Sequence, residues 1–243
     1  MNDNSELDAH RVRSISAIIR DGYLLYTSNF KRIFRASWLI AIVYALAFAW
    51  VMRSTVYDLI PMFIAMFSMP QADPSSFAVQ WLLYELSSSA FEVMVVILAA
   101  CGIKACYEHY TTGEIVRTKH WWGTFPMKTF FKLIIPAICW WFRNWRRWGF
   151  LIGTFILVNI VAGIITIICC LPTFIISLAN IKAYIGAMQG DPLGMPDYLP
   201  TMSFVAFAIA GFIQAFVHLW VVFPFYYAIA TIKQKEINKK KFL

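Results

Sequence analysis

The chain has 243 residues, of which 60% are hydrophobic and 14% are charged. Soluble domains carry about a quarter charged residues and somewhat under half apolar residues, so this composition excludes an ordinary soluble domain. The apolar residues form blocks that are long enough for the roughly 20 residues of helix needed to cross a bilayer. The sequence therefore predicts an all-α fold, a helical bundle integral to a membrane.

The net charge of +8 indicates contact with a membrane surface rather than with nucleic acid. Lys and Arg gather at 11–35, 117–147 and 233–241, where they adjoin apolar blocks. An excess of basic residues beside spanning helices marks the cytoplasmic side of a membrane. We therefore expect anionic lipid headgroups on that side as partners. Other membrane proteins or a second copy of the chain are further candidates, and nucleic acid is not expected.

Residues 1–12 form a polar N-terminal tail that lacks the features of a secretory signal peptide. Apolar residues then recur at helical spacing over 13–34, which predicts an amphipathic helix on the inner surface of the membrane. Its polar side carries Arg20, Asp21, Ser28 and Lys31.

A first spanning helix is expected from Ala36 to Met52, ending near Arg53 and Tyr57. Ala41, Ala45 and Ala49 form a ridge of small residues on it that would allow another helix to pack closely.

The next segment, 58–70, is apolar but contains Pro61 and Pro70. It is expected to lie along the outer interface or to pack on the bundle rather than to span. A second spanning helix follows over 77–106.

The loop 107–147 is long, basic and aromatic. Its apolar part, 125–142, is assigned as a second inner-surface amphipathic helix, because a crossing there would place three arginines outside. Trp and Arg favour the membrane interface. The expected lipid-interface anchors are Lys31, Arg32, Arg35, Trp121, Trp122, Trp140, Trp141, Arg143, Trp145, Arg146, Arg147 and Trp148.

A third spanning helix is expected over 148–170, with Gly149 and Gly153 as a packing face. Residues 171–188 are interpreted as a bent extension or a shallow re-entrant segment. The last helix is expected over 200–232, kinked near Pro224 and followed by a basic cytoplasmic tail over 233–243. This gives about four spans with both termini inside. Six spans are the alternative, if 54–70 and 171–188 each pair with a second crossing segment.

The membrane domain, 13–232, has two halves that look alike, 13–106 and 117–232. Each half begins with an inner-surface helix and has an outer loop that contains Gln-x-Asp-Pro, at 71–74 and at 189–192. A tandem duplication is therefore an alternative to chance similarity. Because both halves start inside, their symmetry axis would lie along the membrane normal.

Polar residues within the spans are the candidates for function, because a charge at mid-bilayer costs roughly 2.5–3.5 kcal/mol. Glu85 and Glu92 share a helix face, with Ser88 and Ser89 between them, and Gln214 and His218 share a face of the last helix. If these faces meet, Glu92 and His218 could handle an ion or a proton. The competing hypothesis is that these groups only bond across helices and hold the bundle together.

The sequence contains no catalytic or metal-binding motif. Its five cysteines lie within or beside apolar runs without metal-ligand spacing, and its four histidines are scattered. We therefore expect no metal, no cofactor and no enzymatic activity.

The stretch from Ile15 to Trp38 contains Asp21–Gly22–Tyr23–Leu24–Leu25 and Ser28–Asn29–Phe30–Lys31, followed by a hydrophobic span. It resembles the opening of uncharacterised bacterial multi-pass proteins and of the membrane domain attached to some glycerophosphodiester phosphodiesterases. The residues at 190–197 and 223–227 look like those of small membrane proteins of the Bacteroides group. The resemblance implies no activity, and no catalytic residue can be carried over.

The leading hypothesis is a non-enzymatic protein of the bacterial cytoplasmic membrane that acts as an interaction or envelope-organising module. A small transporter or channel subunit that uses the intramembrane Glu, Gln and His residues is the alternative. A lipid enzyme embedded in the membrane ranks third.

Overall fold

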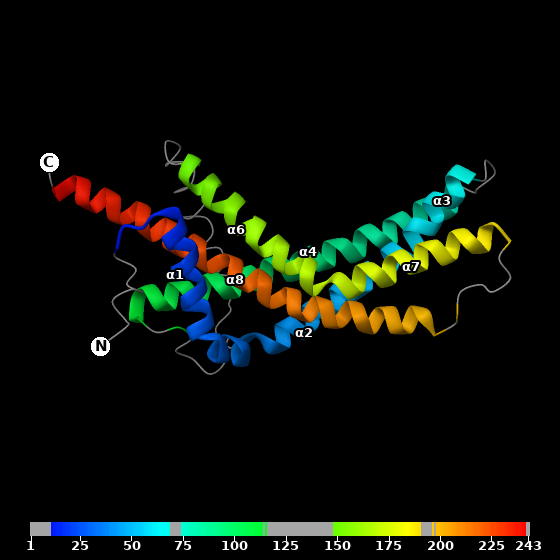
Figure 1. The fold of residues 1–243 in the computed structure, drawn as a ribbon, viewed down its shortest axis with the longest axis horizontal. Helices are drawn as coiled ribbons and strands as arrows, with labels where there is room; N and C mark the ends of the chain where they lie inside the picture. Colours follow the sequence, from blue (N-terminus) through cyan, green and yellow to red (C-terminus); the bar gives the residue numbers. More distant parts are fainter. Residues whose placement is uncertain are drawn as a thin grey trace. The chain divides into compact units, whose positions relative to one another are not determined.

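The computed structural model describes residues 11–68, 74–113, 115, 148–190, 196 and 198–241. Regular structure in these residues is entirely helical (Figure 1). In chain order the elements are α1 (Ile15–Ser28), α2 (Phe30–Ser54), η2 (Thr55–Leu59), α3 (Ile60–Ser68), α4 (Pro74–Thr112), α6 (Trp148–Cys169), α7 (Leu171–Met188) and α8 (Leu199–Lys241).

Five helices of the described part are long and apolar enough to cross a membrane: Phe30–Ile64, Ala78–Thr112, Trp148–Cys169, Leu171–Met188 and Leu199–Lys239. The prediction of an all-α, multi-pass membrane protein is confirmed. The inner-surface helix expected at 125–142 lies outside the described residues.

The helix expected over 13–34 is two helices, because α1 ends at Ser28 and α2 begins at Phe30. Polar side chains at the end of α1 donate to carbonyls of its last turns. Thr27 Oγ1 bonds to the Tyr23 carbonyl at 2.9 Å, and Asn29 Nδ2 bonds to the Leu25 carbonyl at 3.0 Å. The break itself lies at Asn29, whose backbone leaves the helical conformation with φ −109° and ψ 9°. The prediction of one continuous helix was wrong.

The chain stays helical beyond the expected end of the first span. A π-helical turn, η2, joins α2 to α3, and in it the Ile60 N–H bonds to the Thr55 carbonyl five residues earlier. Pro61 has no N–H to continue the usual pattern, and the wider turn lets the chain pass the proline. The segment that begins at 58 is therefore a helical continuation of α2, extending to Ser68.

Helix α7 accounts for the fifth candidate span. Only Cys170 separates it from α6, and helical hydrogen bonds continue on both sides of that residue. The Cys170 N–H bonds to the Thr166 carbonyl at 2.8 Å, and the Phe174 N–H bonds to the Cys170 carbonyl at 3.0 Å. Antiparallel helices need a loop of about 2–5 residues, so the chain does not reverse here. This junction fits a bent extension better than a second crossing.

Helix α8 extends through Pro224 and on to Lys241, so the expected cytoplasmic tail is a continuation of the last helix. Side chains from this extension pack on neighbouring rings. Lys233 Nζ lies 5.1 Å from the centroid of the Tyr110 ring, and Lys235 Nζ lies 5.2 Å from that of Phe150. These contacts give Lys233 and Lys235 aromatic partners.

The chain divides into two compact units, each built from separate stretches. Unit 1 comprises 1–39, 98–164 and 217–243, and unit 2 comprises 40–97 and 165–216. Each unit takes residues from both of the expected tandem halves, so the units and the halves do not coincide. The duplication stays a prediction.

A further similarity between the halves lies at the two helix junctions. Directly after η2 the sequence is Ile60–Pro61–Met62–Phe63–Ile64, and directly after Cys170 it is Leu171–Pro172–Thr173–Phe174–Ile175. The interruption thus precedes a similar Pro-x-Phe-Ile segment in each half. This match supports a common origin and is independent of the two Gln-x-Asp-Pro loops.

Small residues allow close helix approach within unit 2. Ala41, Ala45 and Ala49 of α2 are all buried, and Gly211 of α8 packs against this ridge. A Cβ atom placed on Gly211 would lie 2.8 Å from Phe48 Cδ1 and 3.1 Å from the Cα of Ala45. The ridge is therefore a helix-packing surface. Ala49 also belongs to the core of the unit, together with Val56 and Phe207.

The expected packing face at Gly149 and Gly153 has no such neighbour in the described residues. A Cβ on Gly149 would meet nothing within 4 Å, and one on Gly153 would meet only Ile15 Cδ1, at 3.8 Å. Close helix approach occurs instead at Gly22, Gly102 and Gly211. The packing face at Gly149 and Gly153 stays a prediction.

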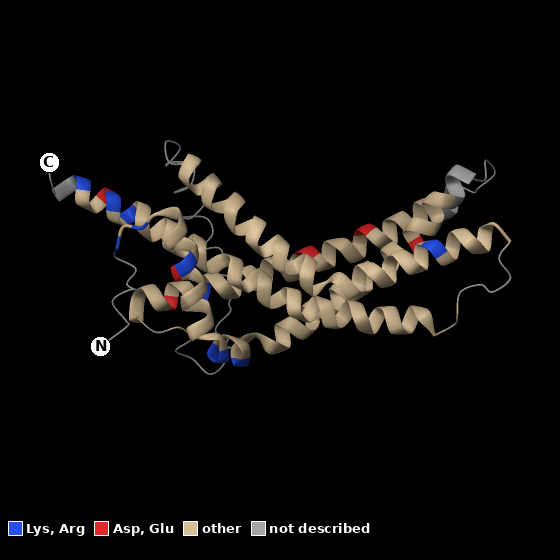
Figure 2. Cartoon of the chain, in the orientation of Figure 1, with Lys and Arg blue, Asp and Glu red and all other residues tan. Residues whose placement is uncertain are grey.

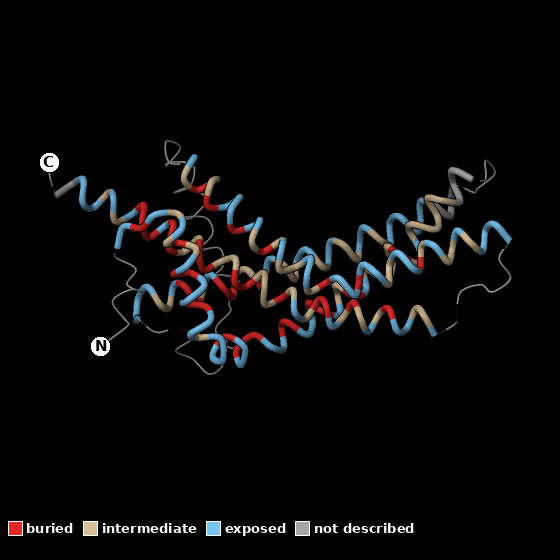
Figure 3. Tube along the Cα trace, in the orientation of Figure 1, coloured by how far each residue is buried: buried red, intermediate tan, exposed pale blue. Residues whose placement is uncertain are grey.

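Many residues along the candidate spans are exposed (Figure 3), and large apolar residues are among them. Leu82 and Leu86 of α4 and Leu178 of α7 are each about two-thirds exposed, at 66%, 67% and 66%. Exposed apolar surface on this scale is unusual for a soluble monomer, and it suits contact with lipid chains.

We expect Gly211→Ala to destabilise the protein, because the added methyl group overlaps Phe48 and the backbone of α2. Overpacking costs about 1–3 kcal/mol, which exceeds the gain of up to about 1 kcal/mol from replacing a helical glycine by alanine. Thermal unfolding of the purified protein in detergent measures the change. Gly149→Ala is the matched control and should not lower Tm; equal Tm values for the two variants would contradict the proposed close approach.

Candidate functional site

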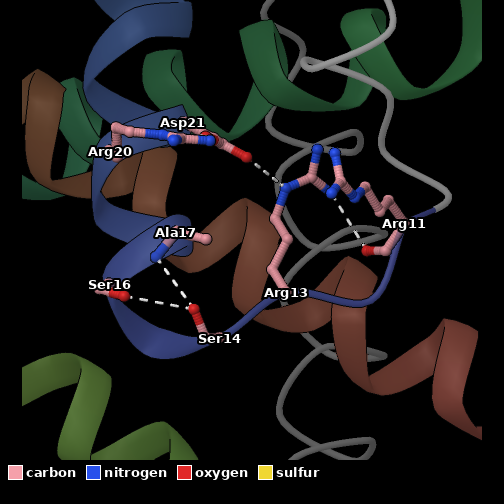
Figure 4. Close-up of polar contacts among 7 residues, drawn as sticks. All are labelled: Arg11, Arg13, Ser14, Ser16, Ala17, Arg20 and Asp21. Atoms are coloured by element: carbon pink, nitrogen blue, oxygen red, sulfur yellow. Dashed lines mark hydrogen bonds and ion pairs between the residues drawn. The ribbon is translucent and has the colours of Figure 1, made fainter.

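Unit 1 contains a buried ion pair at the start of α1 (Figure 4). Arg13 Nε donates to Asp21 Oδ2 at 2.7 Å, and the two side chains are 1% and 4% exposed. Arg20, which is 60% exposed, approaches the other carboxylate oxygen with Nη2 at 3.0 Å. Asp21 therefore lies between two guanidinium groups. Its expected position on the polar face of the helix was wrong, because Arg13 folds back over it from the chain before the helix.

The same part of α1 packs on α8 at its internal proline. A Cβ atom on Gly22 would lie 2.8 Å from the nitrogen of Pro224, so only glycine fits this contact without a shift. The rings of Tyr26 and Phe223 meet edge to face at 5.3 Å. Burial raises the pKa of the Tyr26 hydroxyl.

Arg13 completes the contact, since its guanidinium carbon lies 4.3 Å above the centroid of the Tyr227 ring. The buried ion pair thus positions α1 against α8 and is structural in character.

Exposed basic and aromatic residues accompany this contact on the first turns of α2. Lys31, Arg32 and Arg35 are exposed. The large aromatic residues that are exposed on α1 and α2 nearby in the sequence are Tyr23, Phe30, Phe34 and Trp38, at 52%, 41%, 39% and 42%. Aromatic rings beside cationic side chains are typical of a membrane interface.

Charge is unevenly distributed between the two units in the described part of the chain (Figure 2). Unit 2 has two basic residues, Arg53 and Lys182, and three acidic ones, Asp58, Glu85 and Glu92. The acidic residues of unit 1 are Asp21, Glu108 and Glu236, whereas its Lys and Arg residues are Arg11, Arg13, Arg20, Lys31, Arg32, Arg35, Lys104, Lys233, Lys235, Lys239, Lys240 and Lys241.

Most of the expected aromatic and basic anchors cannot be placed, since 116–147 lies outside the described residues. This range holds Trp121, Trp122, Trp140, Trp141, Arg143, Trp145, Arg146 and Arg147. Trp148 is described and is half-buried at the first turn of α6.

Unit 2 contains a polar cluster without formal charge. Tyr57 Oη lies 2.7 Å from Ser203 Oγ, and Asn180 Nδ2 donates to the same oxygen at 3.2 Å. Ser203 and Asn180 are buried, at 0% and 2% exposure. The three residues come from η2, α7 and α8, so the cluster joins three elements. Nearby, Tyr184 Oη donates to the Pro61 carbonyl at 3.3 Å.

The expected intramembrane polar residues do not form this cluster. Glu85 and Glu92 are exposed, and no hydrogen bond or ion pair of their carboxylates occurs among the described residues. Ser88 is half-buried, and the Ser89 hydroxyl bonds to the Glu85 carbonyl within its own helix at 2.8 Å.

Gln214 is half-buried, and its Oε1 is buried without a described partner. His218 is half-buried in unit 1, whereas the two glutamates and Gln214 belong to unit 2. Ion handling by these residues stays a hypothesis.

Sequence reasoning missed both polar groupings for identifiable reasons. Arg13 lies outside the helix that carries Asp21, so helical periodicity gave no sign of the pair. Asn180 is a polar residue in an apolar run, which is a usable signal, but Ser203 and Tyr57 resemble ordinary helix residues. Only the arrangement of three elements brings them together.

No group of three or more His, Cys, Asp or Glu residues suited to a metal ion occurs in the part of the chain that the structure describes. No family model matches the chain, and comparisons with curated proteins and with solved structures found no match either. The resemblance of the N-terminal stretch to multi-pass membrane domains therefore stays a hypothesis.

We expect Asp21→Asn to destabilise the protein strongly, because it leaves the Arg13 guanidinium buried beside a neutral amide. Loss of one partner of a buried pair costs about 3–5 kcal/mol. Thermal unfolding and limited proteolysis of α1 measure the effect. Arg20→Gln is the control, since Arg20 is largely exposed and should change Tm little; comparable losses in both variants would contradict the assignment of Arg13 as the essential partner.

Proposed function

We propose that the protein is a non-enzymatic, multi-pass protein of the bacterial cytoplasmic membrane that acts as an interaction or envelope-organising module, with unit 1 bound to anionic lipid. The observation that carries the proposal is the exposed Lys31, Arg32 and Arg35 beside exposed aromatic rings at the start of α2. Anionic headgroups attract such residues by about 1 kcal/mol for each basic side chain near the surface.

The uneven distribution of charge supports the proposed orientation. Basic residues dominate unit 1 but not unit 2, and basic residues beside spanning helices favour the cytoplasmic side. With four passes, α6 and α7 acting as one bent pass, both termini lie in the cytoplasm.

The buried ion pair gives this surface a fixed geometry. Asp21 and Arg13 position α1 on the Pro224 turn of α8, and Asn29 alone separates α1 from the basic turns of α2. The exposed cations are thus held near a rigid helix rather than on a loose tail. Such a surface could hold anionic lipid around the protein while its apolar faces contact another membrane protein or a second copy.

We expect the triple variant K31Q/R32Q/R35Q to retain at least about tenfold less phosphatidylglycerol than the parent protein, since it loses about 3 kcal/mol of attraction. The protein would be reconstituted in nanodiscs of phosphatidylglycerol and phosphatidylethanolamine, and the lipids kept after mild detergent extraction would be counted by mass spectrometry. R53Q/K182Q, which removes the two described cations of unit 2, is the control and should leave retention unchanged. Equal retention in all three proteins would overturn the proposed lipid contact.

The topology has its own test. In a background without native cysteines, Gln189→Cys after α7 should react with a membrane-impermeant maleimide in intact cells. Lys239→Cys in the last turns of α8 should react only after the cells are opened, because α8 would carry it to the cytoplasmic side. Both positions are exposed, so protection would reflect the membrane. Labelling of both from the same side would contradict the single pass of α8.

A further inference from the structure

The polar cluster of unit 2 has more hydrogen-bond acceptors than donors. Ser203 Oγ has one proton and donates it to the Leu199 carbonyl at 2.8 Å. It therefore accepts from Tyr57 Oη as well as from Asn180 Nδ2. Tyr57 has used its only proton, and its phenolic oxygen keeps acceptor capacity.

Asn180 supplies the second open acceptor. Its Oδ1 is buried and accepts no hydrogen bond from any described residue, although the side chain as a whole is only 2% exposed. A buried amide oxygen without a partner is unfavourable, and in native proteins it calls for an explanation such as an ion or a water molecule.

Within η2, the carbonyls of Val56 and Tyr57 lack the N–H donor that a residue other than proline would supply at position 61. Pro61 has no N–H, so it cannot donate to the Tyr57 carbonyl four residues earlier or to the Val56 carbonyl five residues earlier. The Ile60 N–H is already committed to the Thr55 carbonyl. Irregular helical backbone within a membrane protein is a recurrent source of carbonyl ligands for cations, and π-helical turns are frequent at functional sites.

We propose that Tyr57, Asn180 and the carbonyls of η2 bind a monovalent metal cation, Na⁺ or K⁺. The surplus of acceptors selects a ligand that is positively charged or donates hydrogen bonds. All the oxygens are neutral, whereas Ca²⁺ and Mg²⁺ sites draw on carboxylates. The charged residues of these elements, Asp58 on η2 and Lys182 on α7, are both exposed and opposite in sign. The site goes beyond the proposed lipid contact, and its failure would leave lipid retention unaffected.

Binding would be measured on the full chain in detergent with ²²Na⁺ and ⁸⁶Rb⁺ as probes, ⁸⁶Rb⁺ standing in for K⁺. Tm would be compared in NaCl, KCl and choline chloride at equal ionic strength. We expect saturable binding of one probe and a higher Tm in the matching salt than in choline chloride. Binding of ²²Na⁺ would identify Na⁺ and binding of ⁸⁶Rb⁺ would identify K⁺. Equal Tm in the three salts with no bound probe would overturn the proposal and leave water as the ligand.

Variants locate the site. Asn180→Leu removes the open amide oxygen and should abolish binding, whereas Asn180→Asp keeps the shape, adds a charge and should bind about tenfold more tightly. Asn159→Leu is the matched control, because Asn159 is exposed on α6 and bonds only to the Phe155 carbonyl of its own helix at 2.8 Å. If Asn180→Leu does not fold, Tyr57→Phe provides the test of the site. We expect it to lower the affinity for the cation about tenfold or more. Parental binding in a folded Asn180→Leu or in Tyr57→Phe would place the cation elsewhere and refute the site.

Discussion

Within the hydrocarbon core of a membrane, a protein must provide hydrogen-bond partners for its own polar groups. In this protein some polar side chains bond to a carbonyl of their own helix, and others bond to a different element. Most hydroxyl groups in the helices satisfy this requirement locally: Ser37 bonds to the Ile33 carbonyl at 2.8 Å, Thr55 to Val51 at 2.7 Å and Ser177 to Thr173 at 2.8 Å. Such residues fit an apolar helix at little cost and need no neighbour. Tyr57 and Asn180 bond instead to Ser203 of α8, so they depend on another element. It is these groups that determine how elements pack.

Proline creates a similar problem in the backbone, because it has no N–H to donate to a carbonyl of the preceding turn. The three prolines Pro61, Pro172 and Pro224 lie in different structural settings. Pro61 is passed by the π-helical turn η2, and Pro172 stands at the start of α7, where its missing N–H costs little. Pro224 lies inside α8, and Gly22 of α1 packs directly against its nitrogen, which carries no hydrogen. Each of these three prolines thus lies beside a change of helical pattern, at a helix start or at a contact with another helix. The prolines of a membrane helix are therefore good guides to where its helices are joined or braced.

Periodicity and hydropathy were sufficient to predict the helical class and the approximate course of the spans, because both depend on residues that are close in sequence. Helix ends were less predictable. The break at Asn29 is a change of backbone angles at a single residue. Along the extension of α8, Lys233 and Lys235 lie over the rings of Tyr110 and Phe150, which are distant in the sequence. The polar groupings were the least predictable. Arg13 with Asp21, and Asn180 with Ser203, meet only after the chain has folded, and the glutamates that periodicity favoured are exposed.

The two polar groupings differ in what they leave unsatisfied, and this difference bears on function. The Asp21 carboxylate has guanidinium partners on both oxygens, so its charge is already neutralised by residues of unit 1. In the neutral cluster of unit 2, Tyr57 and Asn180 donate to Ser203, and the Asn180 amide oxygen stays open. A buried formal charge must be neutralised nearby before the protein can fold, which makes it a poor place to keep spare binding capacity. A neutral oxygen costs less free energy to bury than a charged one, so an acceptor without a protein partner is more easily tolerated in the neutral cluster. On this argument the candidate binding residues are not the charged ones that stand out in the sequence, but the amide and phenol that adjoin an irregular helical turn.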